Sequence, residues 1–208
     1  GYDYETVQIG EQCWFAENLR AENYRNGEPI SNPNNANAYA SLVEDGLGTF
    51  CPYDFDETNG MIRGYLYNGY AVISEFGLCP SNWHVPSYND FLELTAFVNP
   101  NEDYAGGSLK KTGDVNSGGY WEVPNTGATN ETGFSGIGSG TLRYYGAGTE
   151  DAGYEFAELN KDAQFWTSDN SPCGGGCEGL WIKRLRHDAL GFTWNADGVI
   201  NSMAVRCI

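Results

Sequence analysis

The stretch from Gly77 to Ser87 restricts the folding of this chain more than any other part of the sequence. It holds a cysteine, two prolines and a tryptophan-histidine pair, and each proline fixes one backbone angle. Ser87 is a favourable helix N-cap, and Asp90 stands where a capping box needs an acceptor. Apolar residues then recur at helical spacing, which predicts a helix over residues 88–98 that ends before Asn99-Pro100. We therefore expect a rigid loop and an amphipathic helix to anchor the fold.

Short strand-like segments alternate with turns along the rest of the chain. The 208 residues include 28 Gly, 14 Tyr and 6 Trp, a composition that favours strands and turns over helices. A short helix is predicted over residues 38–44, and residues 100–153 are dense in turn formers. No repeat or long linker interrupts the chain, so we expect residues 1–208 to form one α+β domain. Strands are predicted over residues 6–9, 120–123, 141–145, 164–167, 179–183, 191–194 and 203–207.

Charge and cysteine content restrict the partners and the compartment. With 11 Lys and Arg against 28 Asp and Glu, the net charge is −17, which argues against general binding to nucleic acid or to anionic membranes. No run approaches the ~18 apolar residues that a membrane helix needs. Six cysteines in an acidic chain favour disulfides over a metal site or free thiols. We therefore expect an exported protein, extracellular or at the cell surface, that does not insert into membranes.

Six sequence blocks run in order along nearly the whole chain, and the third carries the pattern Cys-Pro-x-x-Trp-His-x-Pro. The blocks cover residues 6–19, 64–68, 77–87, 130–135, 165–168 and 204–207. Together they resemble the Fibrobacter succinogenes major paralogous domain. The resemblance implies a bacterial surface domain with a C-type lectin-like fold: α+β, with short antiparallel strands, one or two helices, long irregular loops and disulfide staples. Some relatives of that fold are variable binding proteins, and no enzymatic activity carries over.

The six cysteines allow fifteen disulfide pairings, and the sequence alone does not choose among them. The resemblance favours a bond between Cys79, which begins the central motif, and Cys207, near the chain end. Cys173 and Cys177 are separated only by glycines, whose flexible backbone suits a small ring. The remaining expected bond joins Cys13 and Cys51.

An acidic loop over residues 50–60 is the candidate metal site. Its pattern Asp54-x-Asp56-x-x-Asn59-Gly60 resembles a calcium-binding loop, although the spacing differs from that of an EF-hand by one residue. Calcium prefers oxygen ligands, so Ca²⁺ is a candidate ligand of Asp54, Asp56 and Asn59. A solvated acidic loop without metal is the simpler alternative, and no other cofactor is implied.

The segment from residue 181 to residue 197 is the candidate binding site. Three of the chain's 11 cations fall within four positions there, close to two tryptophans, and Trp and Arg are enriched at binding hot spots. In the alternative, two ordinary strands bury both tryptophans in the core and leave the cations in solvent. The candidate ligand-binding residues are Trp181, Lys183, Arg184, Arg186, His187, Trp194, Asn195 and Asp197.

These features predict a non-catalytic, adhesin-like domain that binds a glycan or a surface protein through the late loops, residues 169–202. His187 stands in no local motif with a nucleophile, and in a chain with 28 acids neighbouring carboxylates such as Glu155 and Glu158 arise by chance. An enzyme is therefore the least favoured class. The alternative is a structural subunit of an extracellular fibre or adhesin, which forms a homo-oligomer through exposed aromatic faces.

Overall fold

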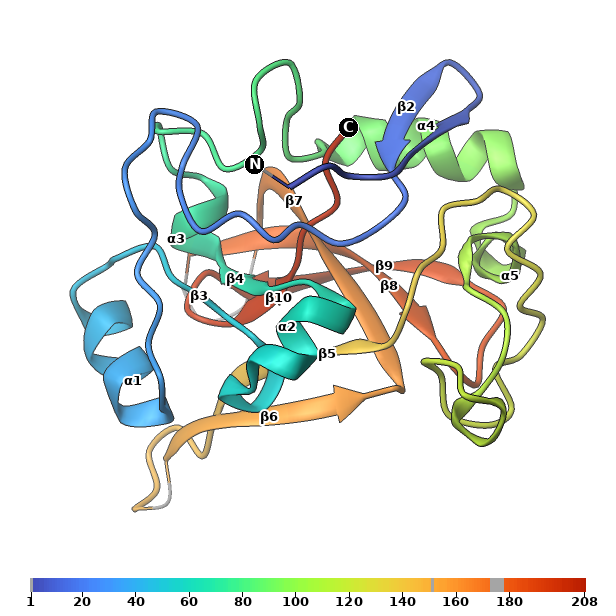
Figure 1. Cartoon of the computed structure of the whole chain (residues 1–208). Coiled ribbons are helices and arrows are strands. Elements are labelled where there is room, and N and C mark those ends of the chain that lie inside the picture. Colours follow the sequence, from blue (N-terminus) through green and yellow to red (C-terminus); the bar gives the residue numbers. More distant parts are fainter. Residues whose placement is uncertain (1, 151, 173–177) are drawn as a thin grey trace.

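The computed structural model describes residues 2–150, 152–172 and 178–208. Within them, eight strands form a central sheet, and a separate two-stranded hairpin begins the chain (Figure 1). The order in the sheet is β3-β4-β10-β7-β8-β9, and β5 pairs with both β10 and β6. The strands are β1 (Thr6–Ile9), β2 (Gln12–Phe15), β3 (Phe50–Cys51), β4 (Leu66–Asn68), β5 (Ser139–Tyr145), β6 (Gly153–Leu159), β7 (Asp162–Ser171), β8 (Gly179–Arg186), β9 (Phe192–Gly198) and β10 (Ser202–Ala204).

Helix α4 follows the anchor loop as predicted. Ser87 Oγ accepts the Asp90 N–H at 3.1 Å, and Asp90 Oδ2 accepts the Ser87 N–H at 2.7 Å, so the capping box is confirmed. Gln12 donates its side-chain N–H to Asp90 O at 2.9 Å, which joins α4 to the N-terminal hairpin beside it (Figure 1). The α-helices are α1 (Ala36–Glu44), α2 (Glu57–Arg63), α3 (Gly69–Val72), α4 (Tyr88–Val98) and α5 (Gly106–Leu109).

The α+β class is confirmed, but several details of the expected architecture are wrong. The described residues contain five α-helices rather than one or two, and β7 runs over 10 residues. β10 pairs with β7 in parallel, so the sheet is not purely antiparallel. Residues 120–123 form no strand, because their backbone bonds to loops: the Val115 N–H donates to Trp121 O at 2.8 Å, and the Glu122 N–H donates to Asn160 O at 2.7 Å.

The sheet separates two apolar clusters. Consecutive residues of a strand point to opposite faces, so Trp166 of β7 packs with Ile182 in one cluster while Phe165 packs with Phe91 of α4 in the other. All four residues are 0% exposed. The Trp166 indole N–H donates to Tyr67 O at 2.7 Å, so its polar atom is satisfied inside the core. This packing holds α4 against the sheet.

The disulfide predictions have three outcomes. Cys79 and Cys207 are bonded, across 128 positions of sequence, which confirms the expected bond. Within the described residues, Cys13 and Cys51 have no disulfide partner: Cys13 is exposed on β2, whereas Cys51 is buried in β3. The expected Cys13–Cys51 bond is therefore wrong, because the hairpin displays one sulfur to solvent and the sheet encloses the other. The expected Cys173–Cys177 bond lies outside the described residues.

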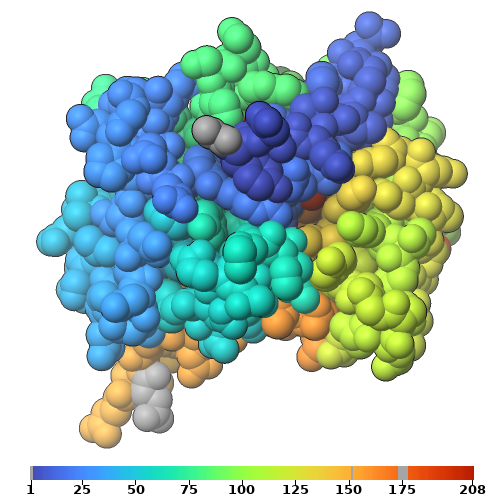
Figure 2. Space-filling model, viewed as in Figure 1, coloured from blue at the N-terminus to red at the C-terminus, as the bar shows by residue number. Residues whose placement is uncertain are grey.

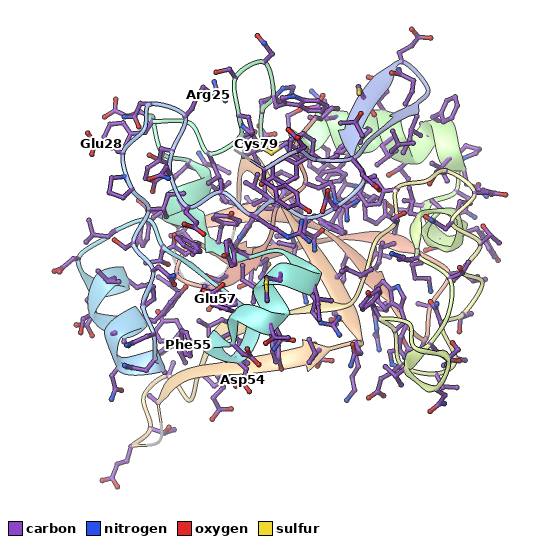
Figure 3. The ribbon with its side chains drawn as sticks, in the orientation of Figure 1. Arg25, Glu28, Asp54, Phe55, Glu57 and Cys79 are labelled. Carbon is purple, nitrogen blue, oxygen red and sulfur yellow. A yellow bond between two sulfur atoms is a disulfide. The ribbon has the colours of Figure 1, made fainter. Side chains whose placement is uncertain are left out.

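Arg25 holds the anchor loop in place, a role that the sequence pattern does not reveal. Its Nε donates to Cys79 O at 2.9 Å and its Nη2 donates to Trp83 O at 2.8 Å; Figure 3 shows Arg25 and Cys79 on neighbouring segments. Trp83 is partly buried and lies 4.5 Å from Phe15, centroid to centroid. The loop also pairs with the chain end, since the His84 N–H donates to Ile208 O at 2.9 Å.

Candidate ligand-binding site

Strands β8 and β9 form an antiparallel hairpin at one edge of the sheet. Side chains alternate between the two faces of a strand, so Trp181 and Lys183 share one face of β8 and Arg184 lies on the other. The register pairs Lys183 with Trp194, which places Trp194 on the same face as Trp181. The predicted site is therefore divided between both faces of the hairpin.

The face toward α4 carries a cluster of three aromatic rings. Tyr88, the first residue of α4, stacks on Trp194 with ring centroids 3.9 Å apart and an angle of 16° between the rings. Trp181 lies 6.1 Å from Trp194 and 5.5 Å from Tyr88, centroid to centroid. All three residues are partly exposed. Each tryptophan therefore packs against the protein on one side and reaches the surface on the other. This arrangement lies between the two alternatives from the sequence, a ligand-binding pair and a pair buried in the core.

A groove of about 600 Å³ adjoins this cluster, between α4 and residues 100–103. We call it the α4–β9 groove. Its aromatic side consists of Tyr88 and Trp194, and its polar side consists of Asn101, Glu102 and Asp103. Asn101 and Asp103 are exposed; Asn101 Oδ1 accepts the Asp103 N–H at 3.1 Å, and the Asp103 carboxylate faces solvent. The groove therefore combines aromatic surface with carboxylate and amide groups.

Lys183 is not a solvated cation, which corrects the prediction that it contacts a ligand. Lys183 is 0% exposed to solvent. The ammonium donates to Glu102 Oε2 at 3.0 Å and to Phe192 O at 2.5 Å, and lies 4.5 Å from the centroid of Trp194. Burial lowers the pKa of Lys183, and the contact with Glu102 opposes that shift. Lys183 therefore supports the aromatic cluster from the buried side of the Trp194 ring.

A chain of polar contacts occupies the opposite face of the sheet. Arg143 Nη2 bonds to Asp197 Oδ2 at 2.8 Å and to Gln164 Oε1 at 2.6 Å. Gln164 donates to Asp162 Oδ2 at 3.2 Å, and the same oxygen accepts Arg184 Nε at 2.8 Å. Arg184 and Asp197 are thus joined through three intervening residues from two other strands. Their charges are already paired within the protein.

The other predicted binding residues lie apart from the groove. Arg186 pairs with Asp188 at 2.9 Å, and His187 Nδ1 lies 3.1 Å from the carbonyl oxygen of Val123. Asn195 is exposed on the edge strand, where its Oδ1 accepts the N–H of the next residue, Ala196, at 2.9 Å. Of the eight predicted residues, Trp181, Lys183 and Trp194 gather beside the α4–β9 groove, whereas Arg184 and Arg186 both lie near Asp162 on the other face of the sheet.

The three predicted calcium ligands have separate roles in the structure. Asp56 Oδ1 caps α2 by accepting the Thr58 N–H at 2.9 Å. Asn59 donates its amide N–H to Tyr53 O at 3.0 Å, which turns a donor toward the loop. Asp54 has a left-handed backbone with φ of 61° and lies beside the start of α2 (Figure 3). In the described part of the chain, no three or more His, Cys, Asp or Glu side chains gather as a metal site.

Sequence reasoning missed the site residues outside β8 and β9, among them Tyr88, Glu102 and Asp103. Tyr88 lies within the helix predicted over residues 88–98, and no local pattern connects residue 102 to β8. One signal was present: Trp181 and Lys183 are two positions apart on a predicted strand, so they had to share a face. Helix α4 packs over part of that face, and Lys183 lies in the buried part.

The fold and the site together define a disulfide-linked α+β domain with an open aromatic groove at the edge of its sheet. The chain belongs to the Fibrobacter succinogenes major domain family, whose model matches residues 7–208; the predicted family is confirmed. No curated protein and no solved structure matches the chain. Among the helices of the described ranges, none is both long and apolar enough to span a membrane.

Proposed function

We propose that the chain is an exported, non-catalytic bacterial cell-surface domain of C-type lectin-like fold, in which residues 1–208 form one adhesin-like module that binds a glycan. The α4–β9 groove is the observation that carries the proposal. Sugar rings present apolar C–H faces to aromatic side chains and hydroxyls to polar ones. The groove offers both within about 600 Å³.

Rigid support of the groove favours binding. Tyr88 is fixed by its stack on Trp194 and by its backbone N–H, which donates to Asp169 Oδ2 at 2.5 Å. Lys183 lies against the ring of Trp194. Side chains that are already ordered lose little conformational entropy when a ligand binds. The predicted late region contributes through Asp169, Lys183 and Trp194, and the corrected site adds α4 and residues 101–103.

Two structural features support export and the fold assignment. The bond between Cys79 and Cys207 is typical of proteins from oxidising compartments. The mixed α+β architecture, with a long irregular stretch between α5 and β5, agrees with the long loops of the C-type lectin-like fold. We assign the α4–β9 groove, rather than those loops, as the glycan site.

A glycan-array screen of the full chain tests this function. We expect a specific hit that Tyr88→Ser weakens roughly three- to tenfold, since a stacked aromatic contributes about that much. Asp103→Asn is expected to weaken the same hit by removing a charged acceptor. Tyr104→Ser is the matched control, because Tyr104 is 58% exposed and lies outside the groove lining. An equal loss in Tyr104→Ser, or no hit at all, contradicts the proposal.

The exposed apolar side chains favour a second candidate, a self-associating subunit. Met61, Phe97 and Tyr104 are each more than half exposed, at 69%, 64% and 58%, and exposed apolar surface promotes association. Light scattering over a range of protein concentrations distinguishes the two functions. A blank glycan screen together with a mass that rises with concentration favours the fibre or adhesin subunit.

A further inference from the structure

A second pocket, of about 340 Å³, shares no lining residue with the α4–β9 groove. The N-terminal segment, the end of α2 and the stretch over residues 111–137 surround it. Figure 2 shows these blue, teal and yellow-green segments meeting around a hollow, with red C-terminal atoms in its depth. We call it the Arg63 pocket.

Four of the chain's 11 cationic side chains line the Arg63 pocket: Arg20, Arg63, Lys111 and Arg206. Among the described residues, only Arg20 of these four forms an ion pair, with Glu17. The chain has 28 acidic residues and a net charge of −17, so carboxylates are abundant. Unpaired cations that gather in one concave site create a local positive potential, which favours an anion there.

Arg63 has unused hydrogen-bond donors in the pocket. A guanidinium carries five N–H groups. Nη1 donates to Gly138 O at 2.8 Å and Nη2 donates to Asn160 Oδ1 at 2.7 Å, while Nε is buried and has no partner in the described residues. Protein atoms enclose Nε, so a bound oxyanion would instead accept the second N–H that each of the two Nη nitrogens carries.

Arg206 and Lys111 add positive charge to the lining of the Arg63 pocket. Arg206 is 0% exposed and donates to Asn18 Oδ1 at 2.8 Å and to Phe15 O at 3.2 Å, so neutral oxygens hold its charge in the floor. Lys111 is exposed at the rim. Its Nζ lies 5.3 Å from the centroid of Tyr120, and Arg63 Cζ lies 5.4 Å from the same centroid. Tyr120 therefore gives the pocket an aromatic wall.

The lining favours a ligand with a single negative charge. Asp3, Glu5 and Glu17 also line the pocket; Glu17 is held by Arg20, and Asp3 and Glu5 are exposed. One positive charge remains in excess over the carboxylates. A second negative charge on the ligand would meet these carboxylates and the net charge of the chain. A carboxylate suits the site, because its planar pair of oxygens matches a guanidinium.

We propose that the Arg63 pocket binds the carboxylate of a sugar acid, with Arg63 and Lys111 contacting the carboxylate and Tyr120 contacting the sugar ring. The site is independent of the α4–β9 groove. The two proposals can fail separately, because Tyr88→Ser alters the groove and leaves every residue of this pocket in place.

Calorimetric titration of the full chain with galacturonate tests the proposal, with galactose, acetate and inorganic phosphate as comparison ligands. We expect saturable binding of galacturonate and at least roughly tenfold weaker binding of galactose, which lacks the charged acceptor. Acetate is expected to bind more weakly because it does not contact Tyr120. Equal affinity for galactose or for acetate overturns the sugar-acid assignment, and tighter binding of phosphate overturns the preference for a single charge.

Substitutions locate the binding. Lys111→Gln removes an exposed cation and is expected to weaken galacturonate binding roughly threefold, as for a solvent-exposed charge pair. Lys161→Gln is the matched control, because Lys161 is exposed and does not line the pocket, yet the change in net charge is the same. Arg63→Gln is expected to abolish binding, with thermal melting as the check on folding. Equal weakening by Lys161→Gln, or unchanged affinity in Lys111→Gln and Arg63→Gln, overturns the proposal.

Discussion

Asn18 and Arg206 lie 188 positions apart in the sequence, and one oxygen joins them: Asn18 Oδ1 accepts Arg206 Nη2 at 2.8 Å and Arg206 Nε at 3.3 Å. The same amide donates through Nδ2 to Arg63 O at 2.9 Å. Asn18 is 1% exposed and Arg206 is 0% exposed. A single side chain thus connects the N-terminal segment, the end of α2 and the chain end.

Asn18→Ala is expected to lower the free energy of unfolding by about 2–4 kcal/mol, because it leaves a charged donor and a backbone carbonyl unsatisfied in the interior. Urea denaturation measures the change. Asn34→Ala, on an exposed asparagine, is the control and should cost little. A loss below ~0.5 kcal/mol at Asn18, the range of ordinary surface substitutions, would show that water replaces the amide.

The Cys79–Cys207 bond constrains the unfolded chain. The double substitution to Ser is expected to lower the free energy of unfolding by about 5 kcal/mol, the chain-entropy cost of a loop this long, given the separation of 128 positions. Cys13→Ser is the matched control, since Cys13 is exposed and has no disulfide partner within the described residues. Equal urea midpoints for the two variants would contradict a stabilising role for the bond.

Lys183 is a buried structural cation, whereas Arg186 is a cation on the surface. Lys183→Ser is expected to cost about 2–4 kcal/mol, because it opens a cavity and removes the donor to the buried Phe192 O. Arg186→Ser should cost under about 1 kcal/mol, since its side chain is 46% exposed. Thermal or urea unfolding compares the pair. Similar losses in both variants would argue that Lys183 is solvated.

Asp56 acts as a helix cap. Asp56→Ala is expected to lower the free energy of unfolding by about 1 kcal/mol through loss of the bond to the Thr58 N–H. The loss should be equal in calcium and in chelator. If calcium instead stabilises the wild type and not the variant, mass action places a bound ion at the loop of Asp54, Asp56 and Asn59.

Tyr154 makes stability sensitive to high pH. Burial raises the pKa of Tyr154 to about 12, where its ring packs edge-on against Tyr39 at 4.6 Å. The neutral phenol is therefore favoured in the folded state, and the unfolded value is near ~10. The contribution of Tyr154 to the free energy of unfolding is fully present below pH ~10 and is lost as the pH rises toward ~12. Urea denaturation should show a steeper decline in the wild type than in Tyr154→Phe; parallel curves would contradict this.

Local signals predicted the fold best where they agreed with each other. The capping residues of α4, its apolar spacing and the proline after it all pointed to one helix, which the structure contains at Tyr88–Val98. β6 was missed because most of its residues are half-buried, so polar and apolar residues do not alternate strongly. The lengths of β7 and β8 depend on their pairing with each other, which a single segment does not encode.

The candidate site was predictable only in part. Strand alternation predicts that Trp181 and Lys183 share a face of β8. It does not predict which face of the strand is covered by other elements. The face is covered by α4 and Glu102. The contact between Lys183 and Glu102 joins residues 81 positions apart in the sequence. The pairing of Arg184 was not predictable for the same reason, because its partner Asp162 lies on β7. Distant pairing, rather than local pattern, decides which charges remain free.

The buried thiol of Cys51 has a practical consequence for measuring how the sheet opens. Cys51 is 0% exposed and belongs to one apolar cluster with Tyr39 and Leu142. Burial raises the pKa of its thiol, so it has almost no reactive thiolate in the folded state. Alkylation of Cys51 therefore requires β3 to leave the core. The rate of Cys51 labelling under native conditions would report that opening equilibrium directly. The labelling rate of the exposed Cys13 in the same molecule would give the reference reactivity of the reagent.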